Sequence, residues 1–163
     1  MRLVGGKCCL LIGLIYANEQ PPTDYFLRGL SLDPKNASIK LSLALAYVHW
    51  AIKRQAENRH HILAQGFAFL TEYYEQRSQV EGTSYEKQEA EYNVARMYHL
   101  LGLVDLAIPH YEICLQFGSQ IIEEGGGESE NFAYEAAFAL QSHWATQGDF
   151  RRARDITHAW LVI

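Results

Sequence analysis

The fold class is decided by residues 88–117, which read QEAEYNVARMYHLLGLVDLAIPHYEICLQF. Apolar or small residues recur there every three or four positions, in one run that ends at Leu101 and a second that begins at Ala107. This spacing is typical of amphipathic helices, and Gly102 between the two runs is a helix stop. The stretch therefore predicts two helices joined by a tight turn.

Each of these two predicted helices carries a small residue followed one turn later by an aromatic one. The pairs are Ala95 with Tyr98 and Ala107 with Tyr111. In the tetratricopeptide (TPR) repeat of about 34 residues, the small residue lets two helices approach closely and the aromatic ring fills the gap beside it. We therefore expect an all-α fold, a TPR-like helical repeat solenoid in which antiparallel helix pairs stack into a superhelix.

Two weaker copies of the pattern flank the clear repeat. Residues 37–47 repeat its first helix, and residues 134–163 repeat both of its helices. Before the first copy, Asp33 and Pro34 form an inter-repeat stop, because proline ends one helix and helps to start the next. We expect repeat-packing contacts from the residues at matching positions, which are Ala44, Tyr47, Ala95, Tyr98, Gly102, Ala107, Tyr111, Trp144, Gly148 and Ala153.

These copies divide residues 1–163 into the parts of a single array. The predicted parts are a partial repeat (1–36), a repeat with a basic insertion (37–80), the clear repeat (88–118), an acidic Gly-rich loop (119–133) and a terminal repeat (134–163). Both ends look unfinished, because the first segment is an imperfect helix before Pro21 and Pro22 and the last is the apolar run 159–163. Since repeats bury their apolar faces against neighbours, we expect a piece of a longer array or a module whose ends dock on partners.

Two segments interrupt the regular spacing. The first, AIKRQAENRHH at residues 51–61, contains no proline or glycine and predicts an extended helix or a tight helical crossover. Its basic side chains are Lys53, Arg54, Arg59, His60 and His61. The second combines Gly125, Gly126 and Gly127 with four nearby glutamates, which cannot bury apolar area, and it predicts a mobile acidic loop.

In TPR stacks the first helix of each pair lines a concave groove in which a bound peptide or helix lies. The predicted lining is mainly apolar, which suits a hydrophobic partner helix better than a charge clamp for a C-terminal carboxylate. The alternative for each position is that neighbouring parts of the array cover it. The candidate groove residues are Leu41, Leu45, Val48, His49, Glu89, Tyr92, Arg96, His99, Leu100, Glu135, Phe138 and Ser142.

Composition argues against several other classes of protein. The net charge of −5 disfavours the broad basic face that binds a nucleic-acid backbone, although small cationic patches remain at the insertion and at residues 151–154. The seven histidines and three cysteines lack zinc-site spacing, and Cys114 occupies a small-residue packing position. No apolar run approaches the length of a membrane span. We therefore predict no catalytic residue, metal, cofactor, direct nucleic-acid contact or membrane contact.

The first residues allow two interpretations. Met1, Arg2 and Lys7 followed by the apolar run 8–17 have the charge and length of a secretory signal, with a passable cleavage site at residues 15–17. The other interpretation is a buried repeat helix whose upstream neighbour is missing. Helical-repeat spacing resumes directly downstream, and this favours the second interpretation.

Residues 41–77 resemble a more specific family. LSLALAYVHWAIKRQAENRHHILAQGFAFLTEYYEQR is similar to the C-terminal array of the TPR subunit of TFIIIC, the general transcription factor of RNA polymerase III, both in the insertion and in the motif Gln65-Gly66-Phe67-x-Phe69-Leu70. The clear and terminal repeats follow in the same order, so the similarity covers residues 24–163. The N-terminal 23 residues match this family poorly.

The resemblance implies a nuclear, non-enzymatic scaffold for transcription of tRNA-type genes. In that family the TPR subunit bridges TFIIIC to TFIIIB, its C-terminal array helps to hold the TFIIIC subunits together, and other subunits make most of the DNA contacts. Partners would be other TFIIIC subunits and components of TFIIIB, and the exposed ends make self-association an open outcome. The alternative is a generic TPR adaptor or co-chaperone that binds peptide segments.

Overall fold

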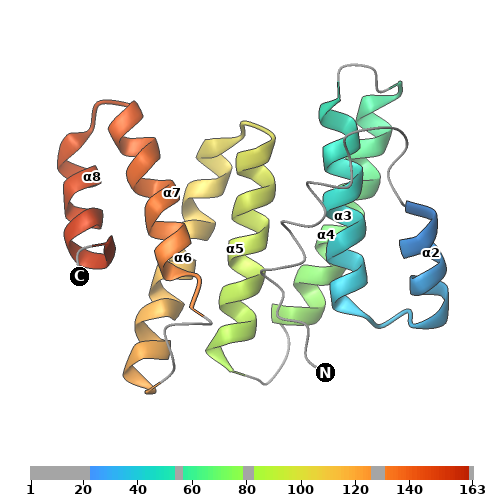
Figure 1. The fold of residues 1–163 in the computed structure, drawn as a ribbon, viewed down its shortest axis with the longest axis horizontal. Coiled ribbons are helices and arrows are strands. Elements are labelled where there is room, and N and C mark those ends of the chain that lie inside the picture. The colour runs from blue at the N-terminus through green and yellow to red at the C-terminus, as the bar shows by residue number, and fades with distance from the viewer. Residues whose placement is uncertain (1–22, 54–56, 79–82, 126–130, 162–163) are drawn as a thin grey trace. The chain divides into compact units, whose positions relative to one another are not determined.

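The computed structural model describes residues 23–53, 57–78, 83–125 and 131–161, and Figure 1 shows their arrangement. Apart from turns this part of the chain is helical, and within it helices pack in antiparallel pairs such as α3 with α4 and α5 with α6, so the predicted all-α, TPR-like class is confirmed. Residues 1–22, for which the sequence allows two interpretations, lie outside it. The helices are α2 (Thr23–Leu32), α3 (Ala37–Ile52), α4 (Arg59–Ser78), α5 (Ser84–Leu100), α6 (Val104–Glu123), α7 (Ala133–Thr146), α8 (Phe150–Ile156) and the π-helical turn η2 (Thr157–Leu161).

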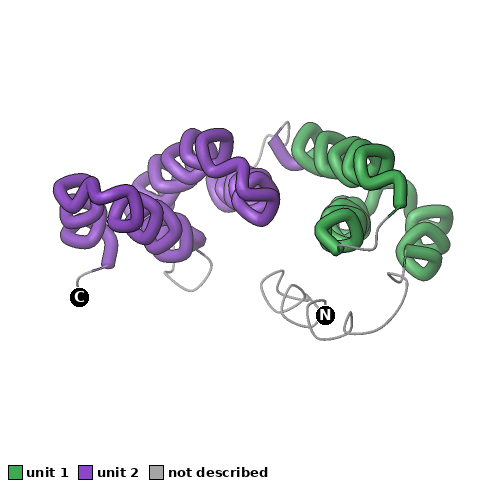
Figure 2. The backbone as a smooth tube through the Cα atoms, turned by 90° about the horizontal axis from the view of Figure 1, so that it is seen from above, with its two compact units in different colours: residues 1–76 green, residues 77–163 purple. Residues whose placement is uncertain are grey.

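The chain divides into two compact units, residues 1–76 and residues 77–163, which are coloured separately in Figure 2. Unit 1 contains α2, α3 and nearly all of α4. Unit 2 contains α5 to η2. Each unit has its own cluster of buried apolar side chains, and each is described by itself below.

In unit 1, α3 and α4 approach closely because Gly66 has no side chain. A Cβ atom at Gly66 would lie 3.2 Å from Cβ of Tyr47 and 3.3 Å from the carbonyl oxygen of Ala44. The Tyr47 ring stacks on Phe69 of α4, with ring centroids 5.9 Å apart. Ala44 and Tyr47 are both buried, so the small and aromatic positions of this repeat lie at its helix-helix contact.

The inter-repeat stop is present where the sequence places it. Helix α2 ends at Leu32, directly before Asp33 and Pro34. Asn36 then caps α3, since its Oδ1 accepts a hydrogen bond of 3.2 Å from the backbone N–H of Ile39. Such a cap satisfies one of the N–H groups that have no partner within the helix.

Of the two structures predicted for the basic insertion, the extended helix is wrong, and the tight crossover between two helices stays a prediction. Helix α3 ends at Ile52, Lys53 has an extended backbone, and α4 begins at Arg59. Asn58 adopts a positive φ of 52°, a conformation that asparagine tolerates better than most residues. Its carbonyl oxygen accepts hydrogen bonds from the N–H groups of His61 and Ile62, and this starts α4.

In unit 2, α5 and α6 form the hairpin predicted from residues 88–117. Gly102 makes the turn with a φ of 75°, a backbone conformation that side chains disfavour, and Gly148 has a φ of 81° between α7 and α8. The hydrophobic core joins α5, α6 and α7 through Ala95, Ala107, Tyr111, Cys114, Ala136 and Leu140. Tyr98 and Trp144 pack against this core, and Ala153 of α8 is also buried.

The acidic loop is shorter than the sequence suggests, because α6 continues through Ser119 to Glu123. Buried residues on α6 recur at helical spacing up to Ile121, whose side chain is fully buried, so burial of this last turn favours helix over loop. The glutamates Glu128 and Glu130 lie outside the described residues, and the chain is buried again at Asn131.

Candidate protein-binding surface

Helices α5 and α7 bring most of the candidate groove residues of unit 2 together. Figure 1 shows α7 passing in front of α6 beside α5. Tyr92, Arg96 and His99 follow one another at helical spacing on α5, and Phe138 and Ser142 lie one turn apart on α7. The two rows meet, since His99 and Ser142 line the same hollow. We call this set the α5–α7 face, consisting of Tyr92, Arg96, His99, Leu100, Glu135, Phe138 and Ser142.

The hollow is open to solvent and has a volume of about 470 Å³. Its walls come from the end of α5, the turn to α6 and the second half of α7. Polar side chains predominate in it, so it suits a polar segment of a partner better than a buried apolar ligand. The lining residues are His99, Gly102, Val104, Asp105, Ser142, His143, Thr146 and Gln147.

Tyr111 of α6 contacts two α5 residues of the α5–α7 face, His99 and Tyr92. Its hydroxyl lies 3.2 Å from Nδ1 of His99, and its ring is tilted against Tyr92 with centroids 6.1 Å apart. Tyr92 also stacks on Phe132, which precedes α7, at 4.9 Å. Burial raises the pKa of the Tyr111 hydroxyl, nearby Tyr92 adds to this, and the Arg96 guanidinium opposes it. The hydroxyl therefore stays neutral and available for hydrogen bonding at physiological pH.

Three carboxylates of α5, those of Glu86, Glu89 and Glu91, have partners within unit 2. Arg77 binds Glu86 at 2.8 Å and Glu89 at 3.2 Å. Glu91 lies 2.6 Å from Nδ1 of His110, whose ring stacks on Tyr98. Glu89 is therefore held by Arg77 and is not a free charge at the α5–α7 face.

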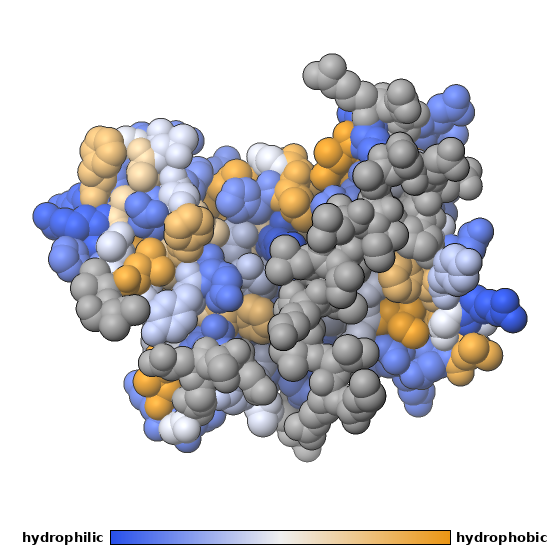
Figure 3. Space-filling model, in the orientation of Figure 1, coloured by the Kyte–Doolittle hydropathy of each residue, from blue (hydrophilic) through white to orange (hydrophobic). Residues whose placement is uncertain are grey.

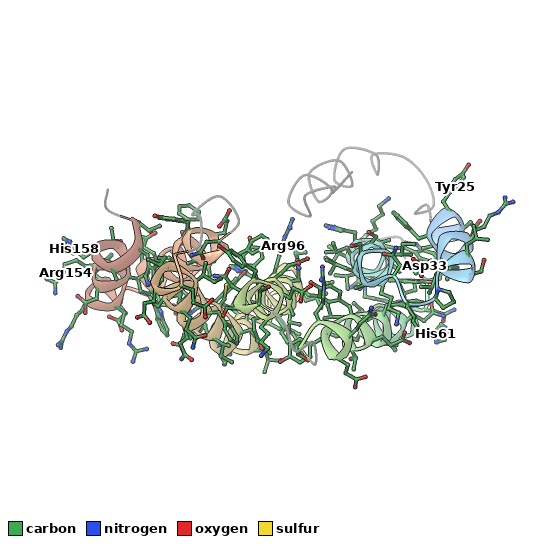
Figure 4. All side chains as sticks on the ribbon, turned by 90° about the horizontal axis from the view of Figure 1, so that it is seen from below. Tyr25, Asp33, His61, Arg96, Arg154 and His158 are labelled. Atoms are coloured by element: carbon green, nitrogen blue, oxygen red, sulfur yellow. The ribbon has the colours of Figure 1, made fainter. Side chains whose placement is uncertain are left out.

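Arg96 differs from these residues. It makes no ion pair with any residue that the structure describes. Figure 4 shows its side chain reaching away from α5. Phe138 and Glu135 on α7 are exposed, with Phe138 at 64%, so the face presents one cation, one anion and an aromatic ring to solvent.

The candidate groove residues of unit 1 are less accessible. Leu45 and Val48 are only 5% and 0% exposed, so they cannot meet a partner in this structure, and this corrects their assignment as groove residues. The close approach of α3 and α4 explains the burial of Val48, whose Cγ2 lies 3.3 Å from the Cβ position of Gly66. Leu41 and His49 are half-buried on α3.

The basic insertion forms an exposed corner at the start of α4. Lys53, Arg59, His60 and His61 are all exposed, whereas Arg54 lies outside the described residues. The Arg59 guanidinium donates to the carbonyl oxygen of Lys53 at 3.4 Å. His61 lies 3.3 Å from the Gln65 amide, and Figure 4 shows its ring at the surface of unit 1. This corner belongs to unit 1, whereas the α5–α7 face belongs to unit 2.

A buried polar network positions α7, and the sequence pattern did not reveal it. The Gln88 amide donates to Oδ1 of Asn131 at 2.6 Å and to the carbonyl oxygen of Cys114 at 3.1 Å. In return, its oxygen accepts from the N–H of Phe132 at 3.2 Å. Asn131 also accepts from the N–H of Ala133, the first residue of α7. A lone Gln at an inward-facing helix position was the available signal, because buried amides need hydrogen-bond partners.

The described part of the chain offers few side chains suited to binding a metal ion or to nucleophilic catalysis. No three His, Cys, Asp or Glu side chains there are grouped so that they could hold a metal ion. Cys114 is fully buried, and burial raises the pKa of its thiol, with Glu135 and Glu91 contributing, so it is a poor nucleophile. None of the described helices is both long and apolar enough to cross a membrane.

The surface is mixed in polarity. On the face drawn in Figure 3, the orange apolar groups of unit 2 are separated by blue hydrophilic ones. Scattered apolar groups of this kind are common on protein surfaces, so the picture alone does not mark a binding site.

Comparison with known proteins identifies relatives of one kind. Transcription factor tau subunit sfc4 of Schizosaccharomyces pombe is 35% identical over 94% of this chain. The transcription factor tau 131 kDa subunit of Saccharomyces cerevisiae is 36% identical over 51% of the chain, and the human general transcription factor 3C polypeptide 3 is 24% identical over 85%. The chain spans only 16%, 8% and 15% of the lengths of these relatives. No protein-family model matches it.

Proposed function

The chain is homologous over most of its length to the TFIIIC subunit that these relatives represent, and from this we propose that it is a protein-protein interaction scaffold within a TFIIIC complex. The observation that carries the proposal is the 35% identity over 94% of the chain. In this role it holds other TFIIIC subunits together, helps to recruit TFIIIB and supports initiation by RNA polymerase III in the nucleus.

The surface chemistry supports a scaffold. The α5–α7 face offers aromatic and aliphatic side chains beside a single arginine, and Tyr, Trp, Phe and Arg are the residues enriched at protein interfaces. The overall charge of −5 fits a subunit that meets proteins while other subunits meet DNA. All three relatives are named as transcription factors.

A peptide-capturing adaptor is less well supported. A clamp for a C-terminal carboxylate needs several cationic or amide side chains that converge on one site. Of the candidate groove residues, only Arg96 is always cationic, and Glu135 adds an opposing charge on α7. The face therefore suits an internal protein segment better than a free C-terminus.

Recovery of partners from nuclear extract tests this function. The protein is tagged and purified from nuclear extract, and the bound proteins are identified by mass spectrometry. We expect the other TFIIIC subunits, with TFIIIB components joining when a tRNA gene fragment is added. Recovery of chaperones without any RNA polymerase III factor would contradict the proposal. Imaging of the tagged protein checks the nuclear location.

A further inference from the structure

The charged and aromatic side chains of the α5–α7 face indicate what kind of partner segment binds there. This inference rests on the function proposed above. We propose that the face binds a segment of another TFIIIC subunit that places an acidic side chain against Arg96 and an apolar side chain against Phe138. Three features of unit 2 support this: the Arg96 charge on α5, the exposed Phe138 ring on α7 and the hollow that both helices line.

The first observation is the charge on Arg96. Glu86, Glu89 and Glu91 on the same helix are engaged by Arg77 or His110. Arg96 is half-buried, and no described carboxylate pairs with it. A partly desolvated guanidinium binds carboxylates in a bidentate geometry that lysine cannot reproduce. An acidic side chain from a partner supplies this missing contact.

The second observation is Phe138. Its side chain is 64% exposed, while its neighbours Ala136, Ala137 and Leu140 are buried in the core. An aromatic ring held on a rigid helix is a typical interface anchor, because its burial stabilises a complex at little cost in side-chain entropy. An aliphatic or aromatic side chain of the partner fits this position.

The third observation connects Arg96 and Phe138 into one surface. Arg96 and His99 are three residues apart on α5, and Phe138 and Ser142 are four residues apart on α7, so each pair lies on one side of its helix. His99 and Ser142 line one hollow between the two helices. A single partner segment that crosses this hollow reaches both Arg96 and Phe138.

Glu135 gives the bound segment a direction. This carboxylate is exposed on the first turn of α7, three residues before Phe138. It repels an acidic side chain placed over α7, whereas Arg96 attracts one placed over α5. The acidic end of the segment therefore lies toward α5 and its apolar end toward α7.

Site-specific photo-crosslinking in the assembled complex tests the inference. The full-length protein receives p-benzoylphenylalanine at Phe138 or, as a matched control, at Leu106 of α6, which is 52% exposed and lies outside the α5–α7 face. After irradiation, the crosslinked peptides are identified by mass spectrometry. We expect the probe at position 138, and not the probe at 106, to capture a segment of a TFIIIC subunit that carries an acidic residue within one helical turn of the crosslink.

Variants of Arg96 then test the charge. Arg96→Glu should reduce the crosslink from position 138 by about tenfold, because it replaces an attraction with a repulsion. Arg96→Lys keeps the charge but loses the bidentate geometry, so it should give a crosslink between those of the wild type and Arg96→Glu, and it reports on any folding defect at this position. Replacing the captured acidic residue with lysine should restore the crosslink in the Arg96→Glu protein.

Several results would overturn the inference while leaving the scaffold function intact. They are an assembled complex with crosslinks only from position 106, a captured segment without an acidic residue, a second copy of this chain as the captured protein, or a crosslink that Arg96→Glu does not change. If the wild-type protein recovers no TFIIIC subunit at all, the proposed function fails, and the inference fails with it.

Discussion

The side-chain amide of Gln88 lies 2.6 Å from Oδ1 of Asn131, forty-three residues further along the chain. Gln88 is on α5, and Asn131 lies two residues before the start of α7, so this hydrogen bond ties α5 to the segment that leads into α7. The same Asn131 oxygen accepts from the N–H of Ala133, and its amide donates to the carbonyl oxygen of Gly118. The relative position of the two helices that form the α5–α7 face thus depends on a buried polar contact.

Replacing Gln88 with leucine should destabilise unit 2. The substitution leaves the N–H of Phe132 without its partner, and loss of one partner of a buried hydrogen bond costs about 1–3 kcal/mol. The free energy of unfolding, measured by urea titration of the 163-residue chain, checks this. Gln120→Leu on the exposed side of α6 is the matched control and should change stability little. Equal effects of the two substitutions would contradict the structural role of Gln88.

Replacing Gly118 with alanine should also destabilise the chain. An added Cβ would lie 2.7 Å from Cβ of Ala133, and overpacking of this kind costs about 1–3 kcal/mol. Both contacting atoms are Cβ atoms, which are bonded directly to the backbones of α6 and α7, so neither can move aside without moving its helix. The midpoint of thermal unfolding measures the effect.

A second substitution tests whether this clash causes the loss of stability in Gly118→Ala. Ala133→Gly removes the opposing Cβ, so the double variant should recover part of the stability that Gly118→Ala loses. Ser119→Ala, at the exposed neighbouring position on α6, serves as the control and should stay within about 0.5 kcal/mol of the wild type. A double variant no more stable than Gly118→Ala would argue against the clash.

The helical class and the α5–α6 hairpin could be predicted from the sequence because both depend on local spacing. Ala95, Ala107 and Tyr111 are buried where the repeat pattern places them, and Gly102 has the positive φ that its turn requires. For Leu45 and Val48 the sequence left open whether a partner or the array itself covers them, and the burial of Val48 depends on how closely Gly66 lets α4 approach α3.

The buried polar contacts could not be predicted from the sequence, because they also depend on how the helices pack. The Gln88–Asn131 bond and the Glu91–His110 pair each join residues that are far apart in sequence, and periodicity carries no information about such pairs. The sequence predicts a loop from residue 119, because the composition after Glu124 is rich in glycine. The structure continues α6 to Glu123, because Ile121 is buried.

Cys114 should be unreactive in the folded chain. Burial raises the pKa of its thiol, and only the thiolate reacts with alkylating reagents. In a variant with Cys8 and Cys9 replaced by serine, iodoacetamide should modify Cys114 slowly in buffer and rapidly in urea. Equal rates in the two conditions would contradict the buried environment.

The same thiol predicts a loss of stability in alkali. A thiol whose pKa is raised in the folded state contributes its full stabilisation below the unfolded pKa of about 9, and this contribution is lost as pH rises further. Cys114→Ala should therefore show a shallower decline in the free energy of unfolding above pH 9 than the parent does. An identical decline in both proteins would mean that Cys114 is not the group responsible.

Transcription reconstituted in a depleted nuclear extract tests both the proposed scaffold function and the binding role of the α5–α7 face. A nuclear extract depleted of the full-length protein is supplied with wild-type protein, with an Arg96→Glu/Phe138→Ala variant or with a Leu106→Ala control, and transcripts from a tRNA gene are measured. We expect wild type and control to restore transcription and the double variant, although folded, not to restore it. No restoration by wild-type protein would contradict the proposed scaffold function, whereas full restoration by the double variant would contradict the binding role of the α5–α7 face.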